Sequence, residues 1–311
     1  MVHNIDPILL DLGVVYFWWY GFSYTAGFTE MFLWLRHERE RLGLTISDVY
    51  DLTLSLVACV LFGGRALEVV FYEWPYYRAH LAQIPAIWLG GMSTHGLLLG
   101  AAAGAALFCR LRGRDFFRIA DALTIPGALL MGIGRIGNFI DGQIVGSVTG
   151  MPWGVKFPDA DGFRHPVVLY DGLKNILMVP LLLYIRRRNP PRGAMVGHFF
   201  FWYAFLRIFV DVFREYPTTL FGLATGQGLS VVMSIAGLLI IIWAYRKRAA
   251  GGEQRTGVER ALWPRRIALA LLLLFCLLMP SDWTQDVPER YGKRHPGLRH
   301  SRMYPAIEAS R

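Results

Sequence analysis

Charged residues and cysteines are scarce in this sequence. Of its 311 residues, 18% are charged and 54% are hydrophobic, and the mean hydropathy is +0.36. This composition argues against a water-soluble fold, because a soluble domain of this length is more polar. The three cysteines, Cys59, Cys109 and Cys276, lie inside apolar runs. Their odd number and their spacing fit neither a disulfide framework nor a metal site, so we expect no metal and no cofactor.

The N-terminus also lacks the basic segment and the small-residue cleavage site of a removable signal peptide, so we expect the first apolar run to remain in the mature protein. A helix needs about 20 mostly apolar residues to cross a bilayer. Seven runs are long enough: residues 14–35, 52–71, 86–109, 119–140, 167–185, 195–213 and 229–245. The sequence therefore predicts an all-α, polytopic membrane bundle of seven transmembrane helices.

An eighth apolar run, residues 267–279, is shorter and its membrane crossing is an open question. As a helix it would be about 20 Å long, which is short for a crossing. Trp263 and Trp283 flank it in the way that interfacial anchors do, which favours a crossing. We expect a transmembrane domain at 1–248, a cytoplasmic linker at 249–266 and an irregular tail at 280–311.

The positions of Lys and Arg predict the orientation, because short loops rich in these residues stay in the cytoplasm. The loops after the first, third, fifth and seventh runs contain eighteen of them, and the opposite side contains four. The N-terminus is therefore predicted to lie outside. The net charge of +9 is then a topology signal, and we expect no nucleic-acid partner.

Four cations lie inside the predicted spans, where an ionisable group is costly and marks a functional path or a structural ion pair. They are Arg65, Arg135, Lys174 and Arg207. Arg207 precedes Asp211 by four residues, and Arg65 precedes Glu68 by three, so each pair shares one helix face. Either pair could bind an anionic headgroup or only hold the bundle together. For Lys174 we favour the structural role.

Arg135 lies in the most unusual segment, residues 131–146, with the sequence MGIGRIGNFIDGQIVG. Gly132, Gly134 and Gly137 predict a smooth surface for close helix packing. Arg135 and Asn138 project from the same face at the end of the span. Packing alone requires neither of these polar side chains, so we interpret them as a binding pair.

Two further polar residues lie beside glycines. His95 belongs to the segment GGMSTHG at residues 90–96, and an imidazole can act as a base near neutral pH. A hydrogen-bonded packing histidine is the alternative. Tyr20 follows two tryptophans in the first span, and interfacial anchoring is enough to explain those tryptophans.

Together these strings resemble the prolipoprotein diacylglyceryl transferase family over residues 7–248. Residues 134–146 are similar to the family signature, which implies that Arg135, Asn138 and Gly146 occupy positions needed for activity. Other motifs of the family match at Tyr20, His95, Arg65 and Arg207, with Asp211 where the family usually has glutamate. The chain departs from the usual pattern at Asp141, Gln143, Leu97, Asp171 and the residue pair before Leu169.

The resemblance implies a multi-pass enzyme of the bacterial inner membrane. Its activity would transfer a diacylglyceryl group from phosphatidylglycerol to the lipobox cysteine in the signal peptide of a preprolipoprotein, with release of glycerol phosphate. Arg135 and Arg207 would bind the phosphate, with Asp211 orienting Arg207 and Asn138 binding the headgroup, and His95 and Tyr20 would assist proton transfer. A non-catalytic phospholipid-binding relative is the alternative. A transporter is disfavoured because the sequence has no internal repeats.

Overall fold

The structure, a computed structural model, describes residues 1–85, 92–142, 144–158, 160–214, 219–220, 223–247, 257–280 and 302. Its longer elements are the helices α1 (Trp19–Leu42), α2 (Ile46–Leu67), α4 (Thr94–Arg112), α5 (Phe116–Ile140), α6 (Val167–Arg187), α7 (Ala194–Asp211), α8 (Thr225–Lys247) and α9 (Leu262–Leu277). The shorter elements are the strands β1 (Ile8–Asp11), β2 (Tyr16–Trp18), β3 (Thr219–Leu220) and β4 (Leu223–Ala224), the π-helix η1 (Glu68–Tyr72), α3 (Trp74–Tyr77) and the 3₁₀ helix η2 (Leu81–Gln83). The predicted all-α membrane fold is confirmed.

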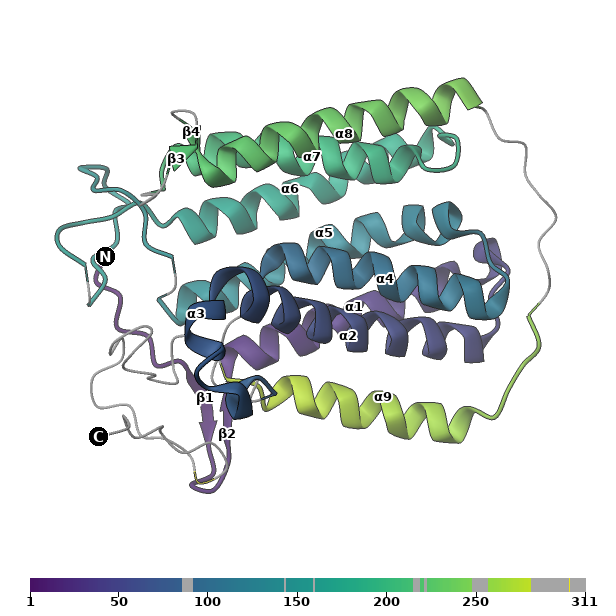
Figure 1. Cartoon of the computed structure of the whole chain (residues 1–311), viewed down its shortest axis with the longest axis horizontal. Coiled ribbons are helices and arrows are strands. Elements are labelled where there is room, and N and C mark those ends of the chain that lie inside the picture. The colour runs from purple at the N-terminus through teal and green to yellow at the C-terminus, as the bar shows by residue number, and fades with distance from the viewer. Residues whose placement is uncertain are drawn as a thin grey trace.

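The long helices lie side by side in a bundle with α5 near its centre (Figure 1). We call the end that holds residue 1 and the β1–β2 hairpin the N-terminal end, and the other end the opposite end. Helices α5 and α7 finish at the N-terminal end, where α6 starts. Three chain segments that are distant in sequence therefore meet there.

Local signals place the helix ends at the opposite end of the bundle. The Thr45 side chain accepts a hydrogen bond from Asp48 N at 3.1 Å, and the Asp48 carboxylate accepts one from Thr45 N at 3.3 Å, which forms a capping box at the start of α2. Gly43 and Gly113 end α1 and α4 with φ of 66° and 61°, a conformation that glycine adopts without strain. These tight turns make α1 antiparallel to α2 and α4 antiparallel to α5.

Glycines set the closest helix contacts. At Gly100 of α4 a Cβ would meet the carbonyl of Cys59 in α2, and at Gly132 it would lie 2.7 Å from Ile176 of α6. At Gly137 it would lie 3.1 Å from Tyr20 Cα in α1, so the predicted close packing of α5 is confirmed at these two α5 glycines. The prediction is wrong at Gly134, because no atom of the described residues lies within 4 Å of a Cβ built there.

Six helices of the described chain are long and apolar enough to cross a membrane: α2 with the adjoining turn, and α4 to α8. Helix α1 has 24 residues, about 36 Å of helix, but it contains several charged side chains such as Glu30 and Arg36. The number of seven crossings stays a prediction.

Two predicted spans start too early. The first was placed at residue 14, but β1 pairs antiparallel with β2, so residues up to Trp18 are extended and α1 begins at Trp19. The third was placed at residue 86, but Ser93 caps α4 by accepting a hydrogen bond from Gly96 N, so the helix begins at Thr94. Residues 86–91 lie outside the described part of the chain. His95 is therefore in the first turn of its helix.

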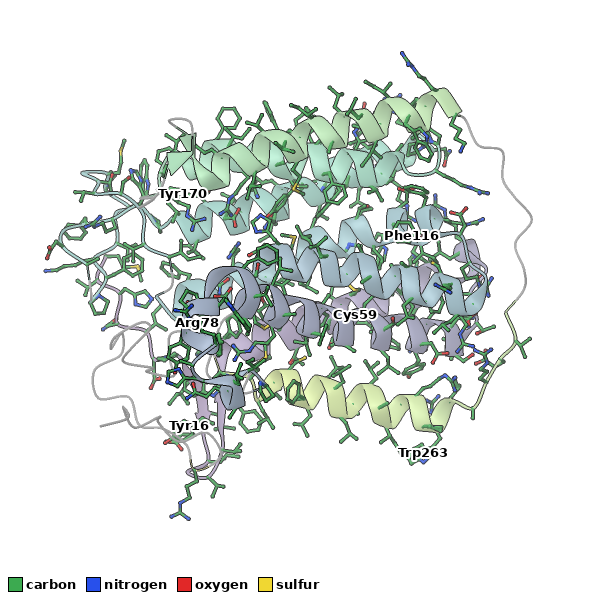
Figure 2. The ribbon with its side chains drawn as sticks, in the orientation of Figure 1. Tyr16, Cys59, Arg78, Phe116, Tyr170 and Trp263 are labelled. Atoms are coloured by element: carbon green, nitrogen blue, oxygen red, sulfur yellow. The ribbon has the colours of Figure 1, made fainter. Side chains whose placement is uncertain are left out.

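Helix α9 packs along α1 and α2 and begins five residues before the predicted span (Figure 1). At the opposite end, Arg265 Nε donates to Asp51 Oδ1 at 2.7 Å, and Glu259 accepts hydrogen bonds from the first backbone N–H groups of α2. Near the N-terminal end, a Cβ on Gly21 would lie 2.6 Å from the Cys276 carbonyl. Trp263 is exposed at the far end of α9 (Figure 2).

Since α9 runs from one end of the bundle to the other, we predict that residue 280 lies on the same side of the membrane as the N-terminus. A reporter enzyme that is active only outside the cytoplasm, fused after Pro280, should be as active as one fused before Met1. A third fusion at the α6–α7 connection, at Asn189, should be inactive. Activity at Asn189 but not at Pro280 would contradict both the predicted orientation and the eighth crossing.

Candidate active site

Three cations from three helices share one carboxylate at the N-terminal end. Asp171, in the first turns of α6, is 2% exposed. Its Oδ2 accepts hydrogen bonds from Arg135 Nε of α5 at 2.7 Å and from Arg207 Nη1 of α7 at 2.6 Å. Its Oδ1 lies 2.8 Å from Lys174 Nζ. The two arginines predicted to bind a headgroup are thus brought together.

Arg207 is also held by its own helix. Its Nε lies 2.9 Å from Asp211 Oδ1, which confirms the pairing predicted from their spacing. Arg214 Nη1 lies 3.7 Å from the same oxygen. Asp211 is 2% exposed, so these contacts fix the direction of Arg207 within a buried setting.

Arg135 has a second partner on α5. Its Nη1 donates to Asn138 Oδ1 at 3.2 Å, and Asn138 is largely buried. The prediction that both side chains share one face is confirmed. A guanidinium carries five N–H donors in a fixed fork, so these contacts orient Arg135 while leaving it chemically suited to an oxyanion.

Lys174 forms a structural ion pair, as expected. Its partner is Asp171, the carboxylate that also binds Arg135 and Arg207. Besides its contact with Asp171, its Nζ lies 3.8 Å from the centre of the Tyr203 ring. We define the cation cluster as Arg135, Lys174, Arg207 and Arg214 with Asp171 and Asp211. It contains two more positive than negative charges, so an anion placed there would be stabilising.

A small pocket lies within the cation cluster. It is lined by Arg135, Asp171, Arg207 and Arg214 together with apolar residues of α6 and α7 and Ile144. Its free volume of about 10 Å³ is room for about one water molecule, because the side chains fill it. Ile144 has a φ of 55°, a left-handed backbone that costs a β-branched residue on the order of 1–2 kcal/mol. The wall of the pocket is therefore strained.

Gly146 joins the signature segment to the end of α7. Its backbone forms an antiparallel bridge with Arg214, and a Cβ there would meet the His165 carbonyl and lie 2.9 Å from the Phe213 carbonyl. Glycine is thus required for the close approach that carries Arg214 to the pocket. Its role in this structure is positioning.

The predicted base, His95, lies on α4, and its predicted partner, Tyr20, lies on α1. His95 is exposed in the first turn of α4, and Arg207 is close enough for its charge to act on the His95 ring. Tyr20 is 2% exposed, packs against the tilted ring of Tyr24 with ring centroids 4.8 Å apart, and belongs to an apolar cluster that includes Leu97 of α4. Both residues therefore lie at the same end of the bundle as the cation cluster.

Arg65 and Glu68 are not part of the cation cluster. Arg65 donates from Nε to the Ile84 carbonyl at 2.9 Å and from Nη2 to the Gln83 carbonyl at 3.0 Å, and its guanidinium covers the Tyr77 ring. It therefore holds the connection between α2 and α4. Glu68 begins the π-helical turn η1. A contact of either residue with lipid stays a prediction.

Comparison with known sequences assigns the chain to a family. The sequence profile of the family described as prolipoprotein diacylglyceryl transferase matches residues 7–243. The chain belongs to this family. Similar proteins named phosphatidylglycerol–prolipoprotein diacylglyceryl transferase occur in Cupriavidus pinatubonensis (36% identical over 270 residues, 82% of this chain and 97% of the relative) and Aeromonas salmonicida (38% over 269 residues, 83% and 96%). A third is from Geobacter sulfurreducens (36% over 254 residues, 79% and 97%).

The family match contains every residue of the cation cluster and ends before α9. In the sequence, Asp171 stands out only as a departure from the family pattern. Arg214 is one of the four basic residues on the predicted outer side. The spacing of Asp171 and Lys174, three residues apart on α6, is the signal that could have indicated a buried pair. No sequence pattern indicated that both arginines would meet on Asp171.

We predict that Asp171→Asn destabilises the protein, because it leaves three buried cations without their shared charge. Removing one partner of a buried ion pair costs about 3–5 kcal/mol, so the unfolding midpoint in detergent should fall by several degrees. Asp171→Glu keeps the negative charge, so its unfolding midpoint should fall much less. Asp161→Asn, on the exposed loop before α6, serves as the matched control. Equal midpoints for Asp171→Asn and this control would contradict the role of Asp171.

Proposed function

We propose that the protein transfers a diacylglyceryl group from phosphatidylglycerol to the cysteine thiol of a preprolipoprotein, the activity for which its relatives are named. The observation that carries this proposal is the convergence of Arg135 and Arg207 on one buried carboxylate inside a membrane bundle. A phosphodiester in a lipid is an anion with two free oxygens. Guanidinium forks bind such a group in two places at once.

The reaction breaks one bond and forms one. The sulfur attacks the glycerol carbon that is ester-linked to phosphate, and the carbon–oxygen bond breaks with its electron pair on the phosphate oxygen. The products are a thioether and glycerol phosphate. The thiol proton passes to a base. The phosphate group changes from one negative charge to two, so negative charge develops on its oxygens in the transition state.

The cation cluster suits that change in charge. Its two surplus positive charges equal the charge of the leaving glycerol phosphate, so the attraction grows as the bond breaks. We assign Arg135 and Arg207 to the phosphate oxygens and Asn138 to the headgroup. Asp211 positions Arg207 through their 2.9 Å contact. Asp171 occupies the arginines before the lipid arrives, and the small pocket must widen when the phosphate replaces it.

The thiol needs help to lose its proton, because the ordinary pKa of cysteine is about 8.5. We assign this role to His95, which is exposed in the first turn of α4, at the same end of the bundle as Arg207. Tyr20 positions the reacting groups or relays the proton. The surrounding positive charge also favours the thiolate.

The substrates fix the setting of the reaction. We propose that the protein is a multi-pass protein of the bacterial inner membrane with its N-terminus and the cation cluster on the outer side. Phosphatidylglycerol would enter sideways from the lipid bilayer, and the signal peptide would present its lipobox cysteine at the same depth. This orientation is supported by the strong excess of Lys and Arg on the other side.

Arg135→Lys tests the assignment of the phosphate site, because lysine keeps the charge and loses the fork. We expect transfer to a lipobox peptide in phosphatidylglycerol vesicles to fall at least about a hundredfold, the size of effect seen when one transition-state donor is removed. Arg187→Lys makes the same exchange on the exposed end of α6 and should leave transfer unchanged. Unchanged turnover of Arg135→Lys would refute the assignment.

Complementation separates catalysis from simple lipid binding. In a bacterial strain depleted of its own transferase, this chain should restore growth and lipoprotein modification, and Arg207→Lys should not. A protein that binds phosphatidylglycerol through Arg135 but fails to complement would be the non-catalytic relative. Detection of the membrane-inserted chain by an epitope tag ensures that failure is not caused by missing protein.

A further inference from the structure

A second group of arginines surrounds a larger pocket at the opposite end of the bundle. This pocket has a volume of about 230 Å³ and lies where α1 and α5 meet the end of α6 and the start of α7. Figure 2 labels Phe116, which marks the beginning of α5 at this end. The arginines in its lining are Arg41, Arg118, Arg186 and Arg192. We call this space the arginine pocket.

The carboxylates that line the arginine pocket are already engaged. Glu38 accepts from Arg186 and lies 3.4 Å from Arg41. Asp121 accepts hydrogen bonds from the backbone N–H groups of Gly193 at 2.7 Å and Val196 at 2.9 Å, and so caps the start of α7. The four arginines therefore outnumber the two carboxylates of the lining.

Like charges are close together in this pocket. The positive charges of Arg192 and Arg41 both act on Arg118, whose guanidinium also donates to the Arg41 carbonyl. Asp115, which is outside the pocket lining, lies 3.2 Å from Arg192 and also acts on Arg118, so it offsets part of this repulsion. Groups of one sign repel each other more strongly as water is excluded, so an anion placed among them would be stabilising.

The rest of the pocket is apolar. Its lining includes Leu42, Ala122, Ile125 and Met195. Trp34 lies next to the pocket, and its Nε1 donates to the Ala122 carbonyl at 3.1 Å. The centre of the Trp34 ring lies 5.1 Å from the Arg186 guanidinium carbon. From Trp34 a groove that also contains the Glu30 carboxyl continues along α1 to Phe22. A ligand with a phosphate at one end and a hydrocarbon chain at the other fits this combination better than a free anion.

We propose that the arginine pocket binds the phosphate headgroup of an anionic phospholipid of the cytoplasmic leaflet. Basic pockets between transmembrane helices bind lipid phosphates. Arg118 and Arg192 are the best placed for this, because the carboxylate beside them, Asp115, is exposed and lies outside the pocket lining, whereas the buried Glu38 holds Arg41 and Arg186 inside it. The site is distinct from the cation cluster, since α5 carries Arg118 at its start and Arg135 near its end. The bound lipid ties α1 and α5 to the α6–α7 connection.

Native mass spectrometry of the full chain in detergent tests this proposal with dioleoyl phosphatidylglycerol as the probe. We expect two lipids to bind to the wild type and only one to bind tightly to R118Q/R192Q, with the affinity of the lost site reduced about thirtyfold. Arg135→Gln should lose the other lipid. Arg110→Gln, an exposed arginine of the same end outside the pocket, is the control and should keep both.

The remaining outcomes also decide the question. Two lipids bound to R118Q/R192Q with unchanged affinity would overturn the arginine pocket and leave the proposed transferase site intact, whereas failure at that site would show as no loss in Arg135→Gln. Equal displacement of the second lipid by dioleoyl phosphatidylcholine or by inorganic phosphate would overturn an anionic lipid as the ligand. If R118Q/R192Q loses its helical circular dichroism, Arg118→Gln alone should show an approximately fivefold weakening.

Discussion

Asp171 receives three cationic side chains that start on three different helices, in a part of the bundle where water is scarce. Without that carboxylate the cations would repel one another, and without the cations a buried carboxylate would be too costly. This constraint fixes how the end of α5, the start of α6 and the end of α7 meet. It also holds the guanidinium groups of Arg135 and Arg207 side by side on Asp171.

The same contacts balance the charge of the proposed site before a lipid binds and allow that balance to change during the reaction. Before lipid binds, Asp171 satisfies Arg135 and Arg207, so the bundle tolerates its surplus charge. A phosphodiester that replaces Asp171 adds one negative charge, and the reaction adds another. In the proposed reaction the cluster therefore interacts more strongly with the transition state, where this charge develops, than with the intact lipid, which is the requirement for catalysis by electrostatic stabilisation. The strained Ile144 backbone lies in the wall that must move.

Helix α9 is an addition to the family framework with a clear structural role. It lies beyond the matched residues, yet it is anchored at both ends, by Arg265 on Asp51 at one end and by its carbonyls against Gly21 at the other. Gly21 directly follows Tyr20, so α9 packs beside one of the residues assigned to the reaction. Part of the side of the bundle formed by α1 and α2 is thereby covered.

Sequence alone determined the membrane class, the helical runs and the local pairs, because composition and spacing along one helix decide which side chains share a face. Arg207 with Asp211 and Arg135 with Asn138 were predictable for that reason. Tertiary structure decided which faces meet: it put both arginines on Asp171, turned Arg65 toward the 83–84 carbonyls and gathered four arginines of the opposite end around one pocket. Such contacts depend on how helices pack, and no spacing within a single helix contains that information.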